Sequence, residues 1–277
     1  MDHEVPAGGT GGHTGPGPFG GGGHFGTVNP VCGRYVLGRN AEELAERFGV
    51  DEPAPDTVTA PGYNVAPTVP VPVVVERETA DGHRTRLLRS CRWGLVPSWA
   101  RDSSGAARMI NARVETVATK PAFRTALARR RCLVPADGWY EWAVGSQTGS
   151  GRRVPYYLTP RDGSPLAFAG LYEVWGHGPD RLVTCAIITT AATGQLTSVH
   201  HRMPLMLAPD RWDGWLDCRS AAPLPADPDS ELVAALELRQ VGTAVGNVRN
   251  QGPQLLAPAS PEADQADQAD QQALDLR

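Results

Sequence analysis

The sequence predicts an α+β fold: a single domain with a mostly antiparallel or mixed β-sheet core and helices at its periphery. Runs of β-forming residues outnumber segments with helical periodicity, and the two do not alternate as a doubly wound parallel sheet requires. No Gly-x-Gly-x-x-Gly follows a predicted strand and no P-loop is present, so the patterns typical of a nucleotide cofactor are missing. A chain of 277 residues is long enough to bury one sizeable core.

The first predicted element after residue 32 is a helix. Asn40 followed by Glu43 has the form of a capping box, and the apolar residues up to Phe48 are spaced to share one face. Helices are also predicted over Lys120–Arg130, Asp210–Leu216 and Ser230–Leu238. Runs bounded by Gly, Pro, Asp or Ser predict strands over Val71–Glu78, Leu87–Leu95, Cys132–Trp142, Val154–Leu158, Leu166–Val174 and Leu182–Thr190.

The two ends differ from the middle. Residues 1–31 hold 11 of the 31 glycines and few sizeable apolar side chains, so we expect a disordered extension. Residues 257–277 repeat Ala-Asp-Gln without an amphipathic face, which predicts an acidic disordered tail. Residues 1–31 carry a net charge of −2 and residues 257–277 carry −4. Because the whole chain carries −4, the predicted domain, residues 32–256, carries +2. This charge is compatible with a nucleic-acid partner.

Several protein classes are excluded by composition. There is no apolar run long enough to span a membrane, and no basic-then-apolar secretory signal. The five cysteines form neither a regular disulfide framework nor a C-x-x-C zinc pair. We therefore expect a reduced, cytoplasmic protein that is a monomer and holds neither a metal nor a cofactor.

Two residues are candidates for nucleophilic and acid–base chemistry. Cys32 stands where the extension ends, and an accessible thiol with a lowered pKa is a nucleophile; the alternative is a small, buried apolar residue. Glu141 follows Trp139 and Tyr140 at the end of a β run, where aromatic neighbours exclude water and raise the pKa of a carboxyl group. Its alternative is an exposed glutamate on an aromatic hairpin.

Three further segments suit anion or base recognition. His200 can exchange protons near neutral pH, or it is a loop histidine without a role. Asn111 and Arg113, two apart on an extended segment, face the same side and suit a phosphate or carboxylate; the alternative is a surface turn with a salt bridge. The indoles Trp93 and Trp99 lie close in sequence and suit either base stacking or core packing.

Seven segments, in order over residues 32 to about 255, together resemble the SOS-response-associated peptidase (SRAP) family, which processes abasic sites in DNA. They are Cys32-Gly-Arg-Tyr, Tyr63-Asn-Val-Ala-Pro-Thr68, Arg92-Trp-Gly-Leu-Val-Pro97, Ile110-Asn-Ala-Arg-Val-Glu-Thr116, Cys132-Leu-Val-Pro-Ala-Asp-Gly-Trp-Tyr-Glu-Trp142, Val199-His-His-Arg-Met-Pro204 and Ala244-Val-Gly-Asn-Val-Arg-Asn-Gln-Gly252. Each segment alone is weak evidence, whereas seven in the same order are specific.

The resemblance implies a set of site residues. The catalytic residues it implies are Cys32, Glu141, His200 and Asn111. The DNA-binding residues it implies are Arg34, Asn64, Trp93, Arg113 and Thr189.

The resemblance also implies a reaction. An amino-terminal cysteine condenses with the aldehyde of an abasic site in single-stranded DNA to give a thiazolidine, a DNA–protein crosslink that shields the lesion. Two alternatives remain: a thiol peptidase that uses Cys32, His200 and Glu141, and a non-catalytic single-stranded-DNA-binding module.

One feature departs from the family pattern. The family's cysteine follows the initiator methionine, whereas Cys32 follows 31 residues and has only an amide nitrogen, which cannot form a thiazolidine. We therefore expect either a cut after Val31, which includes self-cleavage as a peptidase, or translation that starts at Val31 from a GTG codon.

Overall fold

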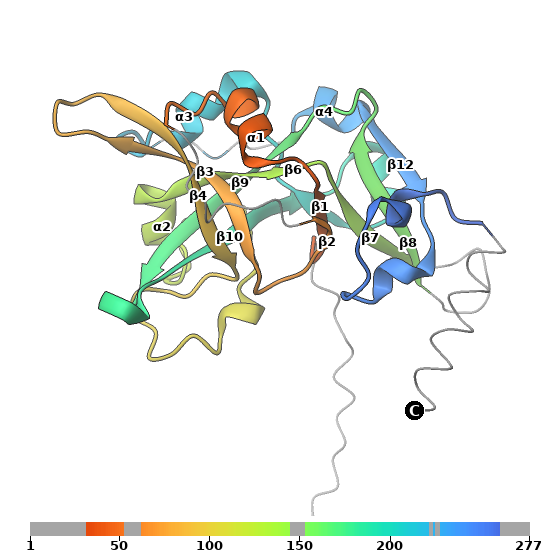
Figure 1. The fold of residues 1–277 in the computed structure, drawn as a ribbon, viewed down its shortest axis with the longest axis horizontal. Helices are drawn as coiled ribbons and strands as arrows, with labels where there is room; N and C mark the ends of the chain where they lie inside the picture. The colour runs from red at the N-terminus through yellow and green to blue at the C-terminus, as the bar shows by residue number, and fades with distance from the viewer. Residues whose placement is uncertain (1–31, 53–61, 145–152, 222–223, 225–227, 261–277) are drawn as a thin grey trace, which may run out of the picture.

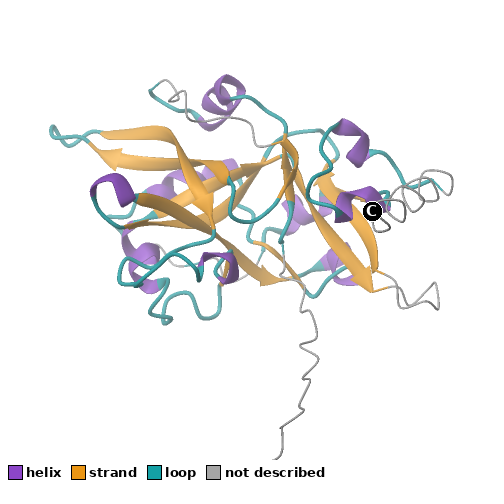
Figure 2. Cartoon of the chain, turned by 60° about the horizontal axis from the view of Figure 1, so that its bottom comes forward, coloured by secondary structure: helices purple, strands orange, loops and turns teal. Residues whose placement is uncertain are grey.

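A computed structural model of the protein describes residues 32–52, 62–144, 153–221, 224 and 228–260 (Figure 1). Its strands form two sheets, and its helices are short and lie at the periphery (Figure 2). The predicted α+β class with a mixed sheet core is confirmed.

The larger sheet closes on itself. It contains β3 (Pro70–Glu78), β4 (Arg84–Trp93), β5 (Asn111–Arg113), β6 (Arg131–Ala136), β9 (Leu166–Trp175), β10 (Leu182–Ala191) and β11 (Arg202–Pro204). The order is β11-β10-β4-β3-β6-β9, and β9 pairs again with β10. β10, β4, β3, β6 and β9 therefore form a ring in which each strand has two neighbours, which removes the open edges of a sheet. β10 is parallel to β4 and β5, and the remaining pairs are antiparallel.

The smaller sheet is antiparallel and has the order β12-β8-β7-β1-β2. Its strands are β1 (Tyr35–Leu37), β2 (Gly62–Val65), β7 (Gly138–Val144), β8 (Arg153–Pro160) and β12 (Leu236–Gln240). Aromatic pairs join the two sheets: Tyr35 meets Trp93 at 5.3 Å between ring centroids, and Trp139 meets Phe168 at 5.8 Å. The two sheets therefore share one core.

The chain passes from one sheet to the other at Asp137 and Gly138. A Cβ at Gly138 would lie 2.4 Å from the carbonyl oxygen of Leu158 and 2.6 Å from the ring of Tyr157, so only glycine lets β7 approach β8 this closely. The expectation of one strand over Cys132–Trp142 is wrong at this point, because β6 and β7 belong to different sheets.

The helices follow the predictions in part. α1 (Ala41–Phe48) has the predicted capping box: the backbone nitrogen of Glu43 donates to Asn40 Oδ1 at 2.9 Å, and the backbone nitrogen of Asn40 donates to Glu43 Oε2 at 2.8 Å. The other helices are α2 (Arg124–Arg129), α3 (Trp212–Leu216) and α4 (Ser230–Ala234). The predicted helix over residues 230–238 is wrong beyond residue 235, because β12 begins there and pairs with β8.

The ends of the chain are described only in part. The expected disorder of residues 1–31 and 261–277 falls outside the described residues. Residues 257–260, which we included in the tail, contact the domain, since the backbone nitrogen of Ala259 donates to the carbonyl of Gln240 at 2.9 Å. Within the described part of the chain, no helix is long and apolar enough to cross a membrane.

Candidate active site

Cys32 and Glu141 meet in a buried position at the start of β1. The backbone nitrogen of Cys32 donates to Glu141 Oε1 at 2.7 Å. Cys32 is 0% exposed and Glu141, on β7, is 4% exposed. Cys32 has a φ of 46°, a left-handed conformation that is uncommon for a residue with a side chain. The fold therefore holds the nitrogen of Cys32 against a carboxyl group that water scarcely reaches.

Burial sets the charge of both groups. Burial raises the pKa of Glu141 to about 8, and the hydrogen bond from Cys32 opposes this rise. Burial, and then the Glu141 carboxylate, raise the pKa of the Cys32 thiol well above its usual value. At neutral pH most Glu141 side chains therefore carry a proton, and the thiol is not ionised. The pKa expected from the aromatic neighbours of Glu141 thus agrees with the structure.

Arg34 and Asn64 bind each other at the same end of the smaller sheet. Arg34 Nη1 donates to Asn64 Oδ1 at 2.7 Å and to the carbonyl of Val245 at 3.0 Å. Asn64 Nδ2 in turn lies 3.0 Å from the carbonyls of Asn247 and Asn250. The guanidinium of Arg34 lies 5.7 Å from the centroid of the Trp142 ring. These contacts explain why residues 244–252 accompany the site in the sequence.

Asn111 and Arg113 lie together on β5, beside β10. Asn111 is opposite Ile187 and Arg113 is opposite Thr189 in this parallel pair. Between them Ala112 is 0% exposed, whereas Arg113 is exposed and Asn111 is half-buried. Their side chains therefore share the outer face of β5, as the spacing predicts.

His200 is held by its own neighbour. Its Nδ1 lies 3.0 Å from the backbone nitrogen and 3.1 Å from the carbonyl oxygen of Arg202. Partial burial lowers the pKa of His200, and the hydrogen bond with the backbone of Arg202 opposes this. The charges of His201, Arg202 and Arg153 lower the pKa further. The ring is therefore neutral at pH 7, and its Nε2 does not take part in these contacts. No hydrogen bond among the described residues joins His200 to Cys32 or Glu141.

Comparison with known proteins identifies the family. The model of the SOS response associated peptidase (SRAP) family matches residues 31–248. The chain belongs to the SRAP family. Over 234 residues it is 36% identical to the abasic site processing protein YoaM of Bacillus subtilis. The alignment covers 82% of this chain and 97% of YoaM. Over 239 residues it is 31% identical to the abasic site processing protein YedK of Escherichia coli, covering 82% and 100%.

A solved structure supports the fold. A Bacteroides thetaiotaomicron protein superposes with a TM-score of 0.65 at 22% identity, covering 83% of this chain and 100% of that one. This similarity concerns the fold alone.

Three residues that we expected to touch DNA are buried in the SRAP domain. Trp93 is 0%, Thr189 1% and Asn64 2% exposed. The indole of Trp93 donates to the carbonyl of Ile110 at 3.0 Å in the core, so Trp93 cannot stack on a base in this conformation. Asn64 and Thr189 are buried too and bind Arg34 and Arg202, so the structure does not place the side chains of these three residues at the surface for direct contact with DNA.

The SRAP domain exposes the second indole of the segment from Arg92 to Trp99, which was a candidate for base stacking but was not among the DNA-binding residues that the resemblance implies. Trp99 is 68% exposed, on the loop that follows β4. The signal was present, because Pro97 and Ser98 predict a loop and hence an exposed side chain. Gly94 starts this loop with a φ of 119°, which reverses the chain after the buried Trp93.

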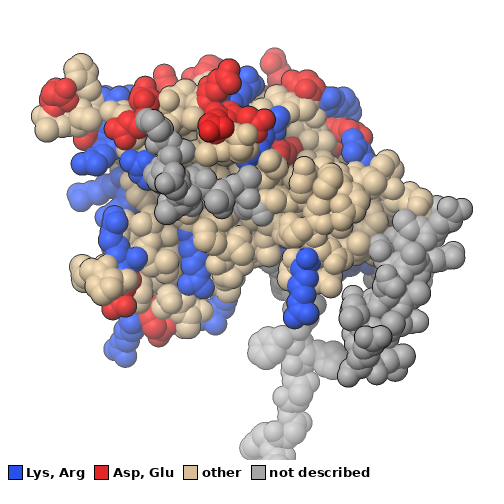
Figure 3. All heavy atoms as spheres, in the orientation of Figure 1, with Lys and Arg blue, Asp and Glu red and all other residues tan. Residues whose placement is uncertain are grey.

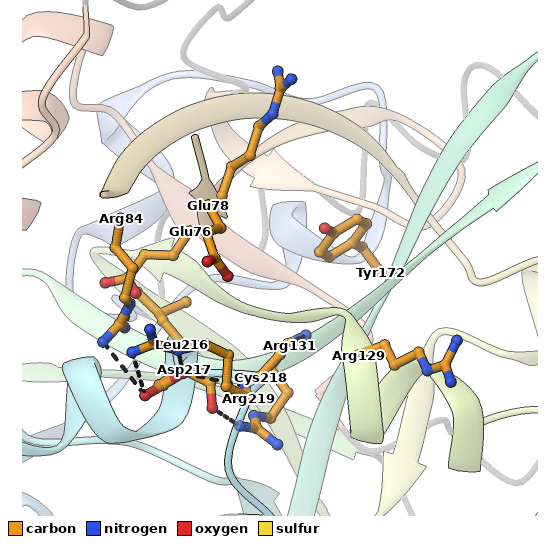
Figure 4. Close-up of a pocket in the computed structure, with 11 residues that line it drawn as sticks. Glu76, Glu78, Arg84, Arg129, Arg131, Tyr172, Leu216, Asp217, Cys218 and Arg219 are labelled. Atoms are coloured by element: carbon orange, nitrogen blue, oxygen red, sulfur yellow. Dashed lines mark hydrogen bonds and ion pairs between the residues drawn. The ribbon is translucent and has the colours of Figure 1, made fainter. Parts of the chain in front are cut away.

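A charged pocket of the SRAP domain lies elsewhere, and none of the predicted site residues lines it (Figure 4). It has a volume of about 260 Å³ and lies between β3, β4 and the segment after α3. Its acids Glu76 and Asp217 are paired with arginines, among them Arg84 and Arg219, so its charges are largely satisfied. Nor is any group of three or more His, Cys, Asp or Glu in the described residues arranged to hold a metal ion.

Proposed function

We propose that this SRAP protein captures abasic sites in single-stranded DNA through Cys32, as a thiazolidine crosslink that shields the lesion. The observation that carries the proposal is the 2.7 Å contact between the nitrogen of Cys32 and buried Glu141. A carboxyl group at this nitrogen can exchange protons with the atom that must attack an aldehyde. The names of the YoaM and YedK relatives support an abasic site as the substrate.

The reaction needs an acid and then a base at one place. The free amine of Cys32 adds to the aldehyde of the opened sugar to give a carbinolamine. Protonated Glu141 gives its proton to the hydroxyl that leaves as water, and an iminium ion remains. The thiol of Cys32 then adds to the same carbon, and its proton passes to the Glu141 carboxylate. The net change joins aldehyde, amine and thiol with loss of one water. Burial raises the pKa of Glu141 to about 8 in the chain that continues through Val31, which favours the protonated starting state; an ammonium group on Cys32 would oppose it.

The aldehyde must first be released from the closed sugar. His200 is suited to this step because it is neutral at pH 7 and its Nε2 is not used in its contacts with Arg202. Nε2 would take the proton of the sugar hydroxyl and return it to the ring oxygen. Every group invoked belongs to one chain, so the proposed unit is a monomer.

The proposed DNA surface lies along residues 101–130. This stretch has seven Lys or Arg and two acidic residues, a net charge of +5, against +2 for residues 32–256 as a whole. In Figure 3 most Lys and Arg side chains lie at the left, on the side of α2, and most acidic side chains lie along the top, over α1. The exposed cations of the stretch are Arg101, Arg108, Arg113, Lys120, Arg124 and Arg129. Cations beside an exposed indole, Trp99, favour a single strand whose bases are free to stack.

The proposal requires a free amine on Cys32. In a chain that continues through Val31, this nitrogen is an amide and cannot form an iminium ion. A chain that begins at Cys32 presents both the amine and the thiol, and the amine would keep its place beside Glu141.

The direct test is the intact mass of the adduct. A chain that begins at Cys32, incubated with single-stranded DNA containing an abasic site, is expected to give a heat-stable product whose mass is protein plus oligonucleotide minus one water. Cys32→Ala is the matched control, because it keeps the amine and removes the thiol; its imine is expected to be lost on heating. A heat-stable adduct with Cys32→Ala would contradict the thiazolidine.

The geometry favours this function over the peptidase alternative. A thiol peptidase needs a thiolate paired with a histidine. Here burial raises the pKa of the Cys32 thiol, and the ring of His200 bonds to Arg202.

A further inference from the structure

The side chain of His200 contacts backbone groups at the outer edge of the larger sheet. β11 is the outermost strand next to β10, and Arg202 is opposite Ala191 in that pair. The backbone nitrogen and carbonyl of Arg202 both face His200 Nδ1 rather than β10. An edge strand leaves such groups unpaired unless something covers them. The position of the imidazole is therefore set by the position of Arg202.

The side chain of Arg202 is itself tied down. Nη1 and Nη2 of Arg202 bind the two carboxylate oxygens of Glu115, the second at 3.1 Å. Nη2 also donates to the carbonyl of Thr189 at 2.6 Å and to Thr189 Oγ1 at 3.2 Å. The Arg202 side chain is 10% exposed and that of Glu115 is 50% exposed, so the arginine is buried while its carboxylate partner reaches solvent.

Glu115 is well placed to anchor this arginine. It follows β5 by two residues, and the backbone nitrogen of Val114 donates to the same Thr189 carbonyl, at 2.9 Å. The hydrogen bond from Arg202 lowers the pKa of Glu115, so the carboxylate is charged at neutral pH. Glu115 thus ties β5 to β11 across β10.

We propose that Glu115 is a positioning residue: acting through Arg202, it holds the imidazole of His200 in the orientation needed for proton exchange at Nε2. The inference rests on the role proposed above for His200. Without Glu115, the guanidinium keeps only the Thr189 contacts, and the backbone to which His200 is bonded loses its anchor on β5.

The contacts with Arg202 fit a base at Nε2. A neutral ring that can take a proton at Nε2 carries its own proton on Nδ1, which donates to the carbonyl of Arg202 at 3.1 Å. Protonation of Nε2 leaves this Nδ1 hydrogen bond in place. The ring can therefore gain and lose a proton at Nε2 without turning, provided that Arg202 stays in place.

The charges around His200 give the direction of the expected change. His201, Arg202 and Arg153 all lower the pKa of His200, and Glu115 is the carboxylate paired with Arg202. Removing Glu115 leaves the charge of Arg202 less compensated, so the pKa of His200 is expected to fall further.

Nitrogen NMR of the histidine rings in the full chain provides a test that does not depend on DNA. Glu115→Ala is expected to change the Nδ1 shift of His200 and to lower its titration midpoint. Glu115→Gln, which still accepts from Arg202, is expected to restore the Nδ1 shift but not the midpoint. Glu237→Ala is the matched control, because it removes the carboxylate partner of an arginine on β12 and should leave His200 unchanged.

Crosslinking supplies a second readout in the chain that begins at Cys32. Glu115→Ala is expected to slow crosslinking about tenfold at saturating DNA, because loss of positioning removes only part of what a general acid–base group contributes to the rate. The pH profile of the rate is expected to shift together with the titration midpoint of His200. An unchanged His200 signal in Glu115→Ala would overturn the inference even if crosslinking proceeds. If the unsubstituted chain that begins at Cys32 does not crosslink, while Glu115→Ala still changes the NMR signal of His200, the proposed function is overturned and the positioning role of Glu115 stands.

Discussion

At the scale of single residues, burial decides what each group can do. Glu141 and Cys32 were identifiable from the sequence because their segments are specific, and the aromatic neighbours of Glu141 predicted its raised pKa. The burial of Asn64, Trp93 and Thr189 was not predictable, because it depends on strands from distant parts of the chain. The expectation of an accessible Cys32 thiol with a lowered pKa is wrong for this structure, because Cys32 is buried and burial raises its pKa.

Glu141 should make both the reaction and the stability depend on pH. The proposed step uses the protonated acid, so crosslinking should slow as pH rises through about 8, the pKa of Glu141. Glu141→Gln should lower the rate about 100-fold, as expected for a lost acid–base group, and remove this pH dependence. Single-turnover rates between about pH 6 and about pH 9 measure both. A variant as fast as the parent would exclude Glu141 as the proton relay.

The sign of the stability effect follows from the same shift. The pKa of Glu141 rises from 4.5 to about 8 on folding, so the folded state binds more protons between these values. The free energy of unfolding should therefore be highest below this range and fall as pH rises, by up to about 1.4 kcal/mol per pH unit from this group. Denaturant unfolding at about pH 5 and about pH 8 measures the fall, which Glu141→Gln should reduce.

The two indoles Trp93 and Trp99 should separate stability from DNA binding. Trp99→Ala removes a side chain that is 68% exposed, so we expect unchanged stability but DNA binding weaker by about 1–3 kcal/mol. Trp93→Ala opens a cavity in the core and should cost about 3–5 kcal/mol of stability. Fluorescence anisotropy and denaturant unfolding measure the two effects. If Trp99→Ala lowers the free energy of unfolding and leaves DNA affinity unchanged, Trp99 contributes to stability and not to DNA binding.

At the scale of elements, local patterns predicted most of the long strands. The predicted run Leu182–Thr190 became β10, Leu182–Ala191, and the capping box of α1 was confirmed. The three-residue strands β1, β5 and β11 were missed, because short strands form only when partners are present. β12 was mistaken for helix because Leu236 and Leu238 extend an apolar run that also has helical spacing.

The segment of α2 and the turn before it should bind phosphates without regard to sequence. Lys120→Gln with Arg124→Gln removes two exposed cations, so the dependence of log affinity on log salt should become shallower by about 1.4 for a single strand. Arg47→Gln on α1, an exposed arginine on the acidic side, is the control and should leave the slope unchanged. Salt titrations with undamaged single-stranded DNA measure both slopes. If both changes lower the salt slope equally, DNA does not bind preferentially along residues 101–130.

At the scale of the whole molecule, the fold brings together groups that the chain keeps apart. Cys32 and Glu141 are 109 residues apart and meet because β1 pairs with β7. The Thr189 carbonyl joins β5 to the Arg202 side chain on β11, and Arg202 holds His200. The two sheets therefore supply different parts of the proposed reaction, the attacking nitrogen from one and the phosphate and histidine groups from the other.

The central claim is that a free amine on Cys32 is the group that captures the abasic site. The measurement that tests it most directly incubates two chains, residues 1–277 and a chain that begins at Cys32, with the same abasic single strand, and weighs every heat-stable product. We expect the chain that begins at Cys32 to form the adduct, and the long chain to form it only in molecules whose mass shows a cut before Cys32. A heat-stable adduct that retains residues 1–31, or no adduct from either chain, would contradict the account.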